Sequence, residues 1–329
     1  MNDSIINNTN PVIWALLDDR AGNRSQCQGV AKLLGLPYEV RELEYTALSA
    51  LPNALKGASF TGLNQASKDV LVSPWPDIII AAGRRTAPIA RAIKHKSNGK
   101  TRLVQIMYPG DSGLSDFDLV CIPQHDKYHE GANILSIPGA PHGVTQDVLD
   151  KASEKWRESF SQLPSPRIAV IVGGSTRRKK FTDDMGRDLG TLANKMATDS
   201  GGSLLITTSR RSGEAGKTMV SLISAPHFSY AWGDQGDNPY FGYLALADAI
   251  IVTGDSVSMC SESCATRAPV YIYAPDGFVI EKHARLHRYL YDAGFARPLE
   301  GKLDDWSHPP LNAAEIIAKA IHDNIPMWF

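Results

Sequence analysis

Three loops in the second half of the chain carry residue types that bind phosphate. The first, Gly173–Lys180, joins two glycines to a run of cations, the second contains Ser209–Arg211, and the third is Gly254–Glu262. Glycine permits close approach of a ligand, arginine pairs with phosphate oxygens, and a helix N-terminus offers unpaired N–H groups. Each loop follows an apolar run that predicts a strand, so we expect all three to meet at one sheet edge as an anion-binding site.

The third of these loops opens a predicted helix. Ser256 and Ser258 are good N-cap residues, and the exposed N–H groups beside them could hold a phosphate. Glu262, one turn further on, could accept hydrogen bonds from a ribose diol. An equally good interpretation is a capped helix in which Glu262 completes a capping box. The residues alone leave both open.

The first half of the chain offers hydrogen-bonding groups in the same position, after predicted strands. Asp18–Gln26 joins the opening strand to its helix and carries a candidate base, and Gly83–Thr86 and Pro123–Asp126 follow later strands. These loops are therefore candidates for the second side of an active site.

Well-known nucleotide signatures are missing or incomplete. The dinucleotide fingerprint G-x-G-x-x-G is absent, so nicotinamide and flavin enzymes have no positive support. Arg211–Thr218 approaches the phosphate-loop motif, but Arg211 stands where that motif requires glycine, and a helix N-terminus rich in small residues is favoured.

Metal sites are also disfavoured. Asp116-Phe117-Asp118 spells the DxD motif of metal-dependent sugar-nucleotide enzymes, yet it stands at the start of a predicted strand, and placement at the strand edge is favoured. His125 and His129 have helical spacing without the glutamate of HExxH, and Cys260 and Cys264 have no nearby ligands to complete a tetrahedron. We expect no metal or cofactor.

Composition narrows the class of protein. The 329 residues include 34 Lys+Arg and 35 Asp+Glu, which disfavours nucleic-acid binding. No run approaches the ~20 apolar residues of a membrane span, and Met1–Asn10 resembles no secretory signal. We therefore expect a cytoplasmic protein. The apolar tail Ile325–Phe329 could rest on a membrane surface or dock on the core.

Apolar runs bounded by Gly, Pro or Asp alternate with helical periodicity, which predicts doubly wound parallel sheets. A second series begins after Gln162–Pro166, so two such units are expected, with a ligand cleft at the carboxyl ends of their strands. Leu311–Asp323 predicts a helix that packs back on the first domain. The expected strands are 11–17, 38–43, 77–81, 102–107, 118–122, 133–137, 167–172, 203–208, 228–232, 249–253 and 270–273.

The residues resemble a known family. Asn238–Met259, followed by Ser261-Glu262 and Pro269–Tyr271, closely resembles the elongated-mitochondria fission-protein-like family. Asp18–Gln26, Gly83–Ala87, Pro123–Asp126 and Ser209–Arg211 match in the same order, so the resemblance covers nearly the whole chain. That family contains plant proteins linked to mitochondrial division and bacterial members that look like GT-B glycosyltransferases.

The resemblance implies an α/β, GT-B-like fold of two Rossmann-like domains with an interdomain cleft. Residues 1–143 would form the N-terminal acceptor domain, 144–300 the nucleotide-sugar donor domain, and 301–329 a helix crossing back to the N-terminal domain. It implies transfer of a sugar from a nucleoside-diphosphate donor to a hydroxyl of a cell-envelope or glycolipid acceptor, without a metal. A nucleotide-sugar epimerase and a non-catalytic fission adaptor are the alternatives, and a peripheral position at the inner membrane is compatible with the acceptor.

Site roles follow from the same resemblance. Many relatives have His where this chain has Asn23, and since Asn is not a useful base, Asp18 or Asp19 becomes the candidate. On the acceptor side we expect Arg20, Gly22, Gln26, Arg84, His125 and Asp126. Gly173-Gly174-Ser175 resembles the glycine loop of the peptidoglycan N-acetylglucosaminyltransferase, with Glu262 as the ribose-binding carboxylate. The donor set is Gly173, Gly174, Ser175, Arg177, Ser209, Arg210, Arg211, Asn238, Tyr240, Asp255, Ser256, Ser258, Met259 and Glu262.

Overall fold

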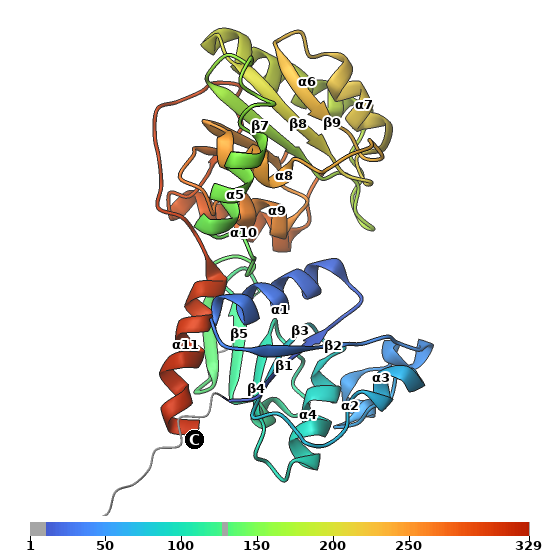
Figure 1. Cartoon of the computed structure of the whole chain (residues 1–329). Helices are drawn as coiled ribbons and strands as arrows, with labels where there is room; N and C mark the ends of the chain where they lie inside the picture. The colour runs from blue at the N-terminus through green and yellow to red at the C-terminus, as the bar shows by residue number, and fades with distance from the viewer. Residues whose placement is uncertain (1–10, 127–130, 329) are drawn as a thin grey trace, which may run out of the picture. The chain divides into compact units, whose positions relative to one another are not determined.

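The computed structural model describes residues 11–126 and 131–328, and the chain divides into two compact units (Figure 1). The first unit contains the described residues of Met1–Pro123, Lys127–Gly143 and Ala313–Phe329. The second contains Gln124–Asp126 and Val144–Asn312. Gln124–Asp126 thus belongs with the second unit, whereas sequence analysis put His125 and Asp126 in the N-terminal domain.

The first unit is built on a six-stranded parallel sheet with the order β2-β1-β3-β4-β5-β6. Alternate side chains of β1 enter opposite cores: Ile13 and Leu17 meet helices α1 and α11, whereas Trp14 and Leu16 meet α4. Its strands are β1 Ile13–Leu17, β2 Tyr38–Glu42, β3 Ile78–Ala82, β4 Arg102–Ile106, β5 Leu119–Pro123 and β6 Ile134–Ile137.

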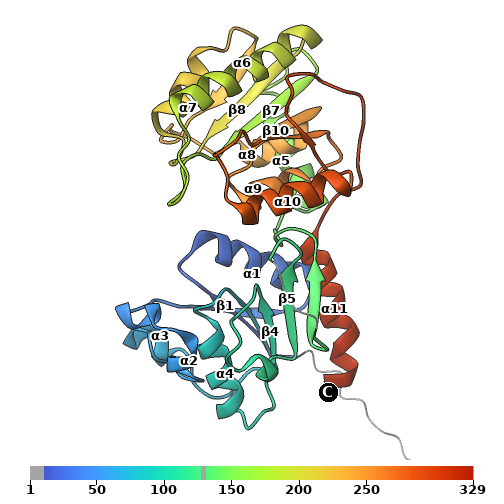
Figure 2. The same cartoon turned by 180° about the vertical axis from the view of Figure 1, so that it is seen from behind.

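Helices cover both faces of this sheet, and α11 lies along α1 (Figures 1 and 2). Ile317 and Ile321 of α11 are fully buried in the core formed with α1, and Ile325 and Trp328 of the apolar tail pack against the same core. The helices are α1 Ala21–Leu33, η1 Ala47–Ala50, α2 Asn53–Lys56, α3 Gln65–Asp69, α4 Ala87–Lys96, η2 Leu114–Asp116 and α11 Ala313–Trp328.

The second unit repeats this design with the order β12-β11-β10-β7-β8-β9. Helices α6 and α7 cover one face and α5, α8, α9 and α10 the other (Figure 2). Its strands are β7 Arg167–Val172, β8 Ser203–Thr208, β9 His227–Tyr230, β10 Ala249–Thr253, β11 Val270–Tyr273 and β12 Arg297–Pro298. Its helices are α5 Gln146–Trp156, α6 Asp183–Ser200, α7 Gly213–Ser221, α8 Tyr240–Leu246, α9 Val257–Ser263 and α10 Glu281–Asp292.

The expected α/β fold of two doubly wound sheets is confirmed, although the short edge strand β12 was not expected and two helices also differ from the prediction. Helix α1 begins at Ala21, so Gly22 and Gln26 lie on a helix and not in a loop. Helix α5 was missed because Leu149 is its only buried residue, although Thr145 caps it by accepting a hydrogen bond from Val148 N.

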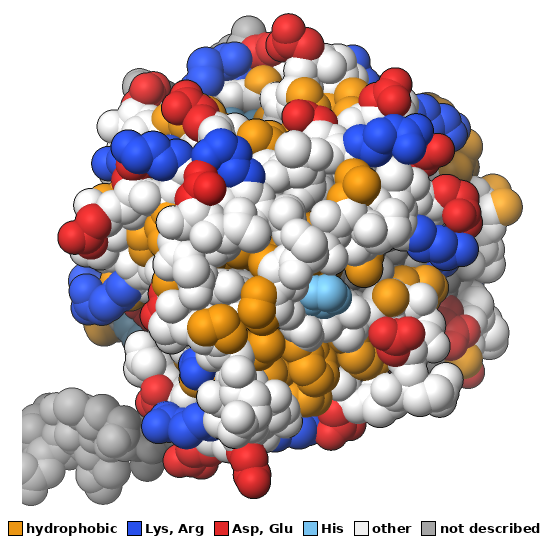
Figure 3. All heavy atoms as spheres, turned by 90° about the horizontal axis from the view of Figure 1, so that it is seen from above, with side chains coloured by type: hydrophobic (Ala, Val, Ile, Leu, Met, Phe, Trp, Pro, Cys, Tyr) orange, Lys and Arg blue, Asp and Glu red, His pale blue; other side chains and the backbone are white. Residues whose placement is uncertain are grey.

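Charges of both signs are interspersed on the face shown in Figure 3, as the formal net charge of -1 suggests. Within the described residues, no helix combines the length and the apolar character needed to cross a membrane.

Candidate functional site

The three phosphate-directed loops of the second unit lie side by side. They follow β10, β7 and β8, which are consecutive neighbours in a parallel sheet. The strand order reverses direction between β7 and β10, and ligands of such sheets bind at the carboxyl ends beside that reversal. The fold therefore brings together the loops that sequence analysis singled out.

Both glycines of the first loop lie so close to the other two loops that a larger residue would clash with them. A Cβ at Gly173 would lie 2.5 Å from each carboxylate oxygen of Asp255, and one at Gly174, whose φ is +128°, would lie 2.2 Å from the Arg211 carbonyl oxygen. Gly173 N also donates to Thr253 Oγ1 at 2.7 Å. These contacts show that the glycines let three loops pack together, a role distinct from the close ligand approach that the sequence suggested.

Asp255 connects the three loops from a buried position. Its fully buried carboxylate accepts hydrogen bonds from Gly174 N at 3.1 Å and from Arg211 Nη1 at 2.5 Å. Its other oxygen, Oδ1, is buried with no hydrogen-bond partner among the described residues. Asp255 thus orients Arg211, whose side chain remains 34% exposed, and it does not itself reach the surface.

Two further arginines of the donor set project outward. Arg210 and Arg177 are exposed, and no carboxylate of the described chain forms an ion pair with either. The hydroxyl groups of the two serines already form hydrogen bonds within the loops. Ser209 donates to the Gly173 carbonyl oxygen, and Ser175 Oγ accepts from Phe181 N. Arg210 is therefore the cation best placed to meet an anion beside Arg211.

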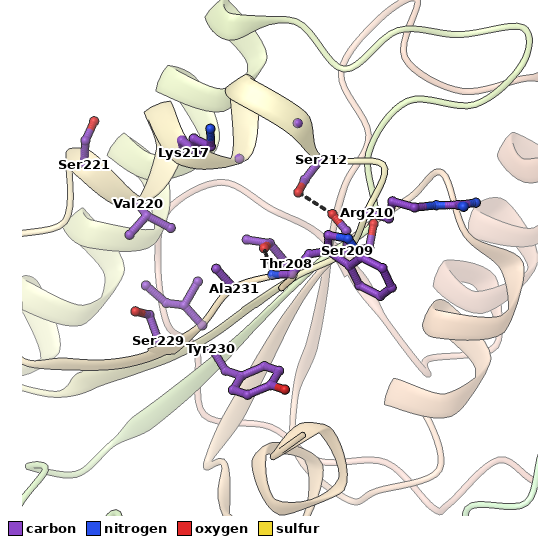
Figure 4. Close-up of a pocket in the computed structure, with 14 residues that line it drawn as sticks. Thr208, Ser209, Arg210, Ser212, Lys217, Val220, Ser221, Ser229, Tyr230 and Ala231 are labelled. Atoms are coloured by element: carbon purple, nitrogen blue, oxygen red, sulfur yellow. Dashed lines mark hydrogen bonds between the residues drawn. The ribbon is translucent and has the colours of Figure 1, made fainter. Parts of the chain in front are cut away.

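A pocket of about 370 Å³ lies beside the Ser209–Ser212 loop, between α7 and strands β8 and β9 (Figure 4). Val220 and Ala231 contribute apolar walls, and Arg210 and Lys217 contribute cations. Figure 4 shows Ser212 bonded to Ser209, with a distance of 2.7 Å from the hydroxyl to the carbonyl oxygen. The arginine loop therefore adjoins an apolar volume large enough for part of a small ligand.

Glu262 is not a capping-box residue, so that interpretation was wrong. Ser256 caps α9 by accepting a hydrogen bond from Met259 N at 3.3 Å, which leaves Glu262 a full turn too far along the helix. Instead, Tyr240 donates its hydroxyl to Glu262 Oε2 at 2.5 Å. Burial raises the pKa of the Glu262 carboxyl, and the bond from Tyr240 opposes that rise.

The other donor-set residues support this pair or lie next to it. Asn238 Oδ1 accepts from Tyr240 N at 3.0 Å and so fixes the start of α8. Ser258 and Met259 are partly buried in α9. Because α9 has only seven residues, we expect the arginines to contribute more positive potential at this site than the N-terminus of the helix.

Three residues of α10 near these loops were missed from the sequence. His287 Nε2 donates to the Gly254 carbonyl oxygen at 3.0 Å, Lys282 pairs with Asp126 at 2.5 Å, and His283 has a buried Nδ1 without a hydrogen-bond partner in the described chain. Burial lowers the pKa of His287 to about 4. The four-residue spacing of His283 and His287, which places both on one face of the helix, could have identified them from the sequence.

His125 belongs to the same neighbourhood. It is buried, its carbonyl oxygen accepts from Arg285 Nε at 2.9 Å, and burial lowers its pKa to about 4. His129, the other half of the proposed metal pair, lies outside the described residues. No cluster of three His, Cys, Asp or Glu suited to a metal occurs in residues 11–126 and 131–328.

In the first unit, the candidate bases follow β1 beside the loop after β3. Asp18 is buried and accepts hydrogen bonds from Arg85, from Arg20 N at 3.0 Å and from Asn23 Nδ2 at 2.8 Å. Asp19 also pairs with Arg85 but is 52% exposed, and the hydrogen bond from Arg85 lowers its pKa. Asp18 thus stabilises the loop, whereas Asp19 is open to solvent.

The remaining acceptor-side residues are spread around this loop. Arg84 is exposed and donates to the Leu51 carbonyl oxygen at 2.9 Å, whereas Gln26 is buried in α1 with its Oε1 unpartnered among the described residues. Gly22 is exposed, and a Cβ there would meet no atom within 4 Å.

The motifs that sequence analysis set aside are structural. Asp116 pairs with Arg91 at 2.6 Å and Asp118 with Lys94 at 2.7 Å at the edge of β5, as favoured from the sequence. Cys260 and Cys264 are buried, and burial raises the pKa of both thiols. Gly213 opens α7, which agrees with a simple helix N-terminus.

Sequence comparison identifies relatives across almost the whole chain. The profile of the family described as mitochondrial fission ELM1 matches residues 21–325. An uncharacterized protein of Rickettsia prowazekii is 31% identical over 94% of this chain and 97% of its own length. The mitochondrial fission protein ELM1 of Arabidopsis thaliana is also 31% identical, over 78% of this chain and 65% of its own length, which is less than two thirds of the plant protein.

Structure comparison finds similar folds at low identity. MurG of Acinetobacter baumannii matches with a TM-score of 0.52 and 13% identity, covering 96% of this chain and 100% of MurG. The UDP-GlcNAc 2-epimerase of Methanocaldococcus jannaschii matches with a TM-score of 0.53 and 12% identity, over 95% and 99% of the two chains. At these identities the likeness establishes a shared GT-B-like fold.

Proposed function

Because the chain belongs to the mitochondrial fission ELM1 family and has a GT-B-like fold, we propose that it is a glycosyltransferase. It moves a sugar from a nucleoside-diphosphate donor to a hydroxyl of a cell-envelope or glycolipid acceptor. The observation that carries this proposal is the packed set of loops after β7, β8 and β10, in which Arg210 lines the pocket and Arg211 pairs with Asp255.

The second unit supplies the donor site in this proposal. Arg210 and Arg211 bind the diphosphate and stabilise the negative charge that grows as it leaves, a task that two guanidinium groups perform without a metal. Asp255 holds Arg211 in place, so this charge is oriented before the donor arrives. Glu262, positioned by Tyr240, accepts hydrogen bonds from the ribose, and the apolar pocket beside Arg210 takes the base.

The first unit supplies the acceptor site. Asp19 is the group proposed to take the proton from the acceptor hydroxyl, because it is exposed whereas Asp18 is buried and already accepts three hydrogen bonds. Arg85 lowers the pKa of Asp19, so the carboxylate is ionised near neutral pH, although it is a weaker base while it remains paired with Arg85.

The donor site is tested by calorimetric titration of the protein with nucleoside diphosphates and their sugars. We expect one nucleotide to bind and Glu262→Ala to weaken it by about 1–3 kcal/mol, because two ribose hydroxyls lose a charged acceptor. Glu154→Ala, at an exposed position of α5, is the matched control and should bind like the wild type. Absence of binding by every nucleotide at millimolar concentration would refute the transferase and favour the adaptor.

An epimerase is the second candidate, because UDP-GlcNAc 2-epimerases match this fold as well as MurG does. The two activities differ in what they require: an epimerase converts a nucleotide sugar alone, whereas a transferase needs an acceptor. Incubation of the bound nucleotide sugar without acceptor, followed by NMR of the sugar ring protons, separates them.

A further inference from the structure

A group of cations in the first unit lacks acidic partners. Lys56 ends α2, and Arg84 follows β3 in the loop that leads to α4, with α2 lying against α4 (Figures 1 and 2). Lys56 is only 6% exposed, yet its Nζ donates to a backbone carbonyl, that of Ser49, at 3.2 Å. Among the described residues, no carboxylate forms an ion pair with Lys56 or Arg84.

A buried ammonium without a counter-ion is unfavourable. Lysine is almost never fully buried unless it is paired, and its charge must be compensated by an anion or lost. Burial, together with repulsion from Arg84 and Arg85, lowers the pKa of Lys56. Arg85 pairs with Asp18 and Asp19, so these three side chains together carry one negative charge, whereas Lys56 and Arg84 themselves have no carboxylate in an ion pair among the described residues.

Two unsatisfied buried atoms near Arg84 are hydrogen-bond donors. The hydroxyl of Tyr45 and Nε of Arg85 are buried without hydrogen-bond partners in the described chain, and the Arg85 guanidinium stacks on the Tyr45 ring at 4.2 Å. An ammonium also has three N–H groups, of which the Ser49 carbonyl uses one. A cluster of unused donors is complementary to a ligand that only accepts hydrogen bonds.

The cluster is held in place rigidly. Asn53, at the start of α2, is buried and donates to the Arg84 and Pro109 carbonyl oxygens, each at 2.9 Å, while Arg84 Nη1 donates to Asn53 Oδ1 at 3.3 Å. These bonds hold Arg84 against the start of α2, the helix that ends at Lys56, before any ligand arrives, and such preorganisation is how anion sites gain affinity.

We infer that Lys56 and Arg84 form a binding site for a phosphate group, and that this group belongs to the acceptor. Two cations with several free donors match a doubly charged phosphate better than a singly charged carboxylate. The assignment to the acceptor rests on the proposed function, because Asp19 is on the same sheet edge. The binding of phosphate does not depend on it.

The test compares Lys56→Met, Arg84→Met and the control Lys100→Met, an exposed lysine, by calorimetry and thermal unfolding with inorganic phosphate and with acetate. Wild type and Lys100→Met should be stabilised by phosphate more than by acetate. Lys56→Met should weaken phosphate binding about ten- to hundredfold, the loss of one charged hydrogen-bonding partner, and should raise the unfolding temperature in phosphate-free buffer, because a desolvated charge is removed.

The inference would be overturned if phosphate bound to both variants as tightly as to the wild type and stabilised them equally. It would also be overturned if Lys56→Met unfolded at a lower temperature without phosphate and kept its phosphate affinity. Arg84→Met keeps the test valid if the buried substitution prevents folding, since Arg84 is exposed. Nucleotide titration of the same proteins separates this result from failure of the donor site, which lies in the other unit.

The source of the phosphate is resolved with glycerol phosphate and with phosphatidylcholine vesicles that contain or lack phosphatidic acid. If only glycerol phosphate binds, and its binding requires Lys56, the acceptor is soluble. If vesicles that contain phosphatidic acid bind, and their binding requires Lys56, the acceptor is a lipid. Both results support the site, and binding to neither refutes it.

Discussion

At the scale of single residues, equal chemical types have different roles because burial differs. Asp18 and Asp19 are adjacent and both contact Arg85, yet the side chain of Asp18 is 1% exposed and that of Asp19 is 52% exposed. A buried carboxylate that accepts three hydrogen bonds stabilises the loop, and an exposed one is free to act on a ligand. Sequence alone could not separate them.

This difference predicts opposite behaviour on substitution. Asp18→Asn should lower the free energy of unfolding by about 1–3 kcal/mol, because the largely buried Arg85 loses one of its two partners. Asp19→Asn should change it by less than about 1 kcal/mol, since an exposed ion pair contributes little. Urea unfolding of both variants measures the effect, and equal losses would contradict the assignment. Nucleotide affinity, which we propose for the second unit, serves as the control.

At the scale of elements, helix α11 completes the first unit although it comes last in the chain. Its residues Ala313, Ala314, Ile317, Ala318 and Ile321 are buried with residues of α1. The apolar spacing in the sequence predicted an amphipathic helix and its return to the first domain. The surface that it covers was not predictable, because a periodic pattern identifies the buried face of a helix and not its partner.

Two adjacent isoleucines of α11 test this packing. Ile317 is fully buried and Ile316 is 39% exposed. Ile317→Ala should therefore cost about 2–5 kcal/mol of stability, through lost burial and a cavity, whereas Ile316→Ala should stay within about 0.5 kcal/mol. Chemical denaturation of the two variants is a direct comparison. Similar values would show that α11 does not pack as described.

The loops after β7, β8 and β10 also show that a sequence pattern identifies an element without identifying the residues it contacts. Their composition predicted phosphate-directed groups at one sheet edge, and the strand order places them there. The contact of Asp255 with Arg211 joins residues 44 positions apart, and the Tyr240–Glu262 bond joins two helices. Such contacts depend on the packing of whole elements, which no local motif encodes.

At the scale of the whole molecule, buried histidines couple folding to pH. Burial lowers the pKa of both His125 and His287 from 6.5 to about 4. Between these values the unfolded chain binds protons that the folded chain does not. The free energy of unfolding should therefore fall as the pH decreases from 6.5 to 4, by at most about 1.4 kcal/mol per pH unit for each histidine.

Urea unfolding at a series of pH values measures this slope. His287→Gln removes one titrating group while its amide can still donate to the Gly254 carbonyl oxygen, so the variant should lose stability less steeply across the same interval. Parallel curves for the two proteins would mean that His287 is not held neutral by burial.

The sequence by itself determined the class of fold, the order of most strands and helices, and the loops that carry arginine, glycine and carboxylate. These properties are local, since period, turn residues and strand-end position are written in neighbouring residues. Only the tertiary structure decided which carboxylate is buried, that Glu262 meets Tyr240, that α10 adds histidines, and that Lys56 lacks a counter-ion. Burial and pairing arise when distant segments pack, and the free energy of a charged group depends on that environment more than on its neighbours in the chain.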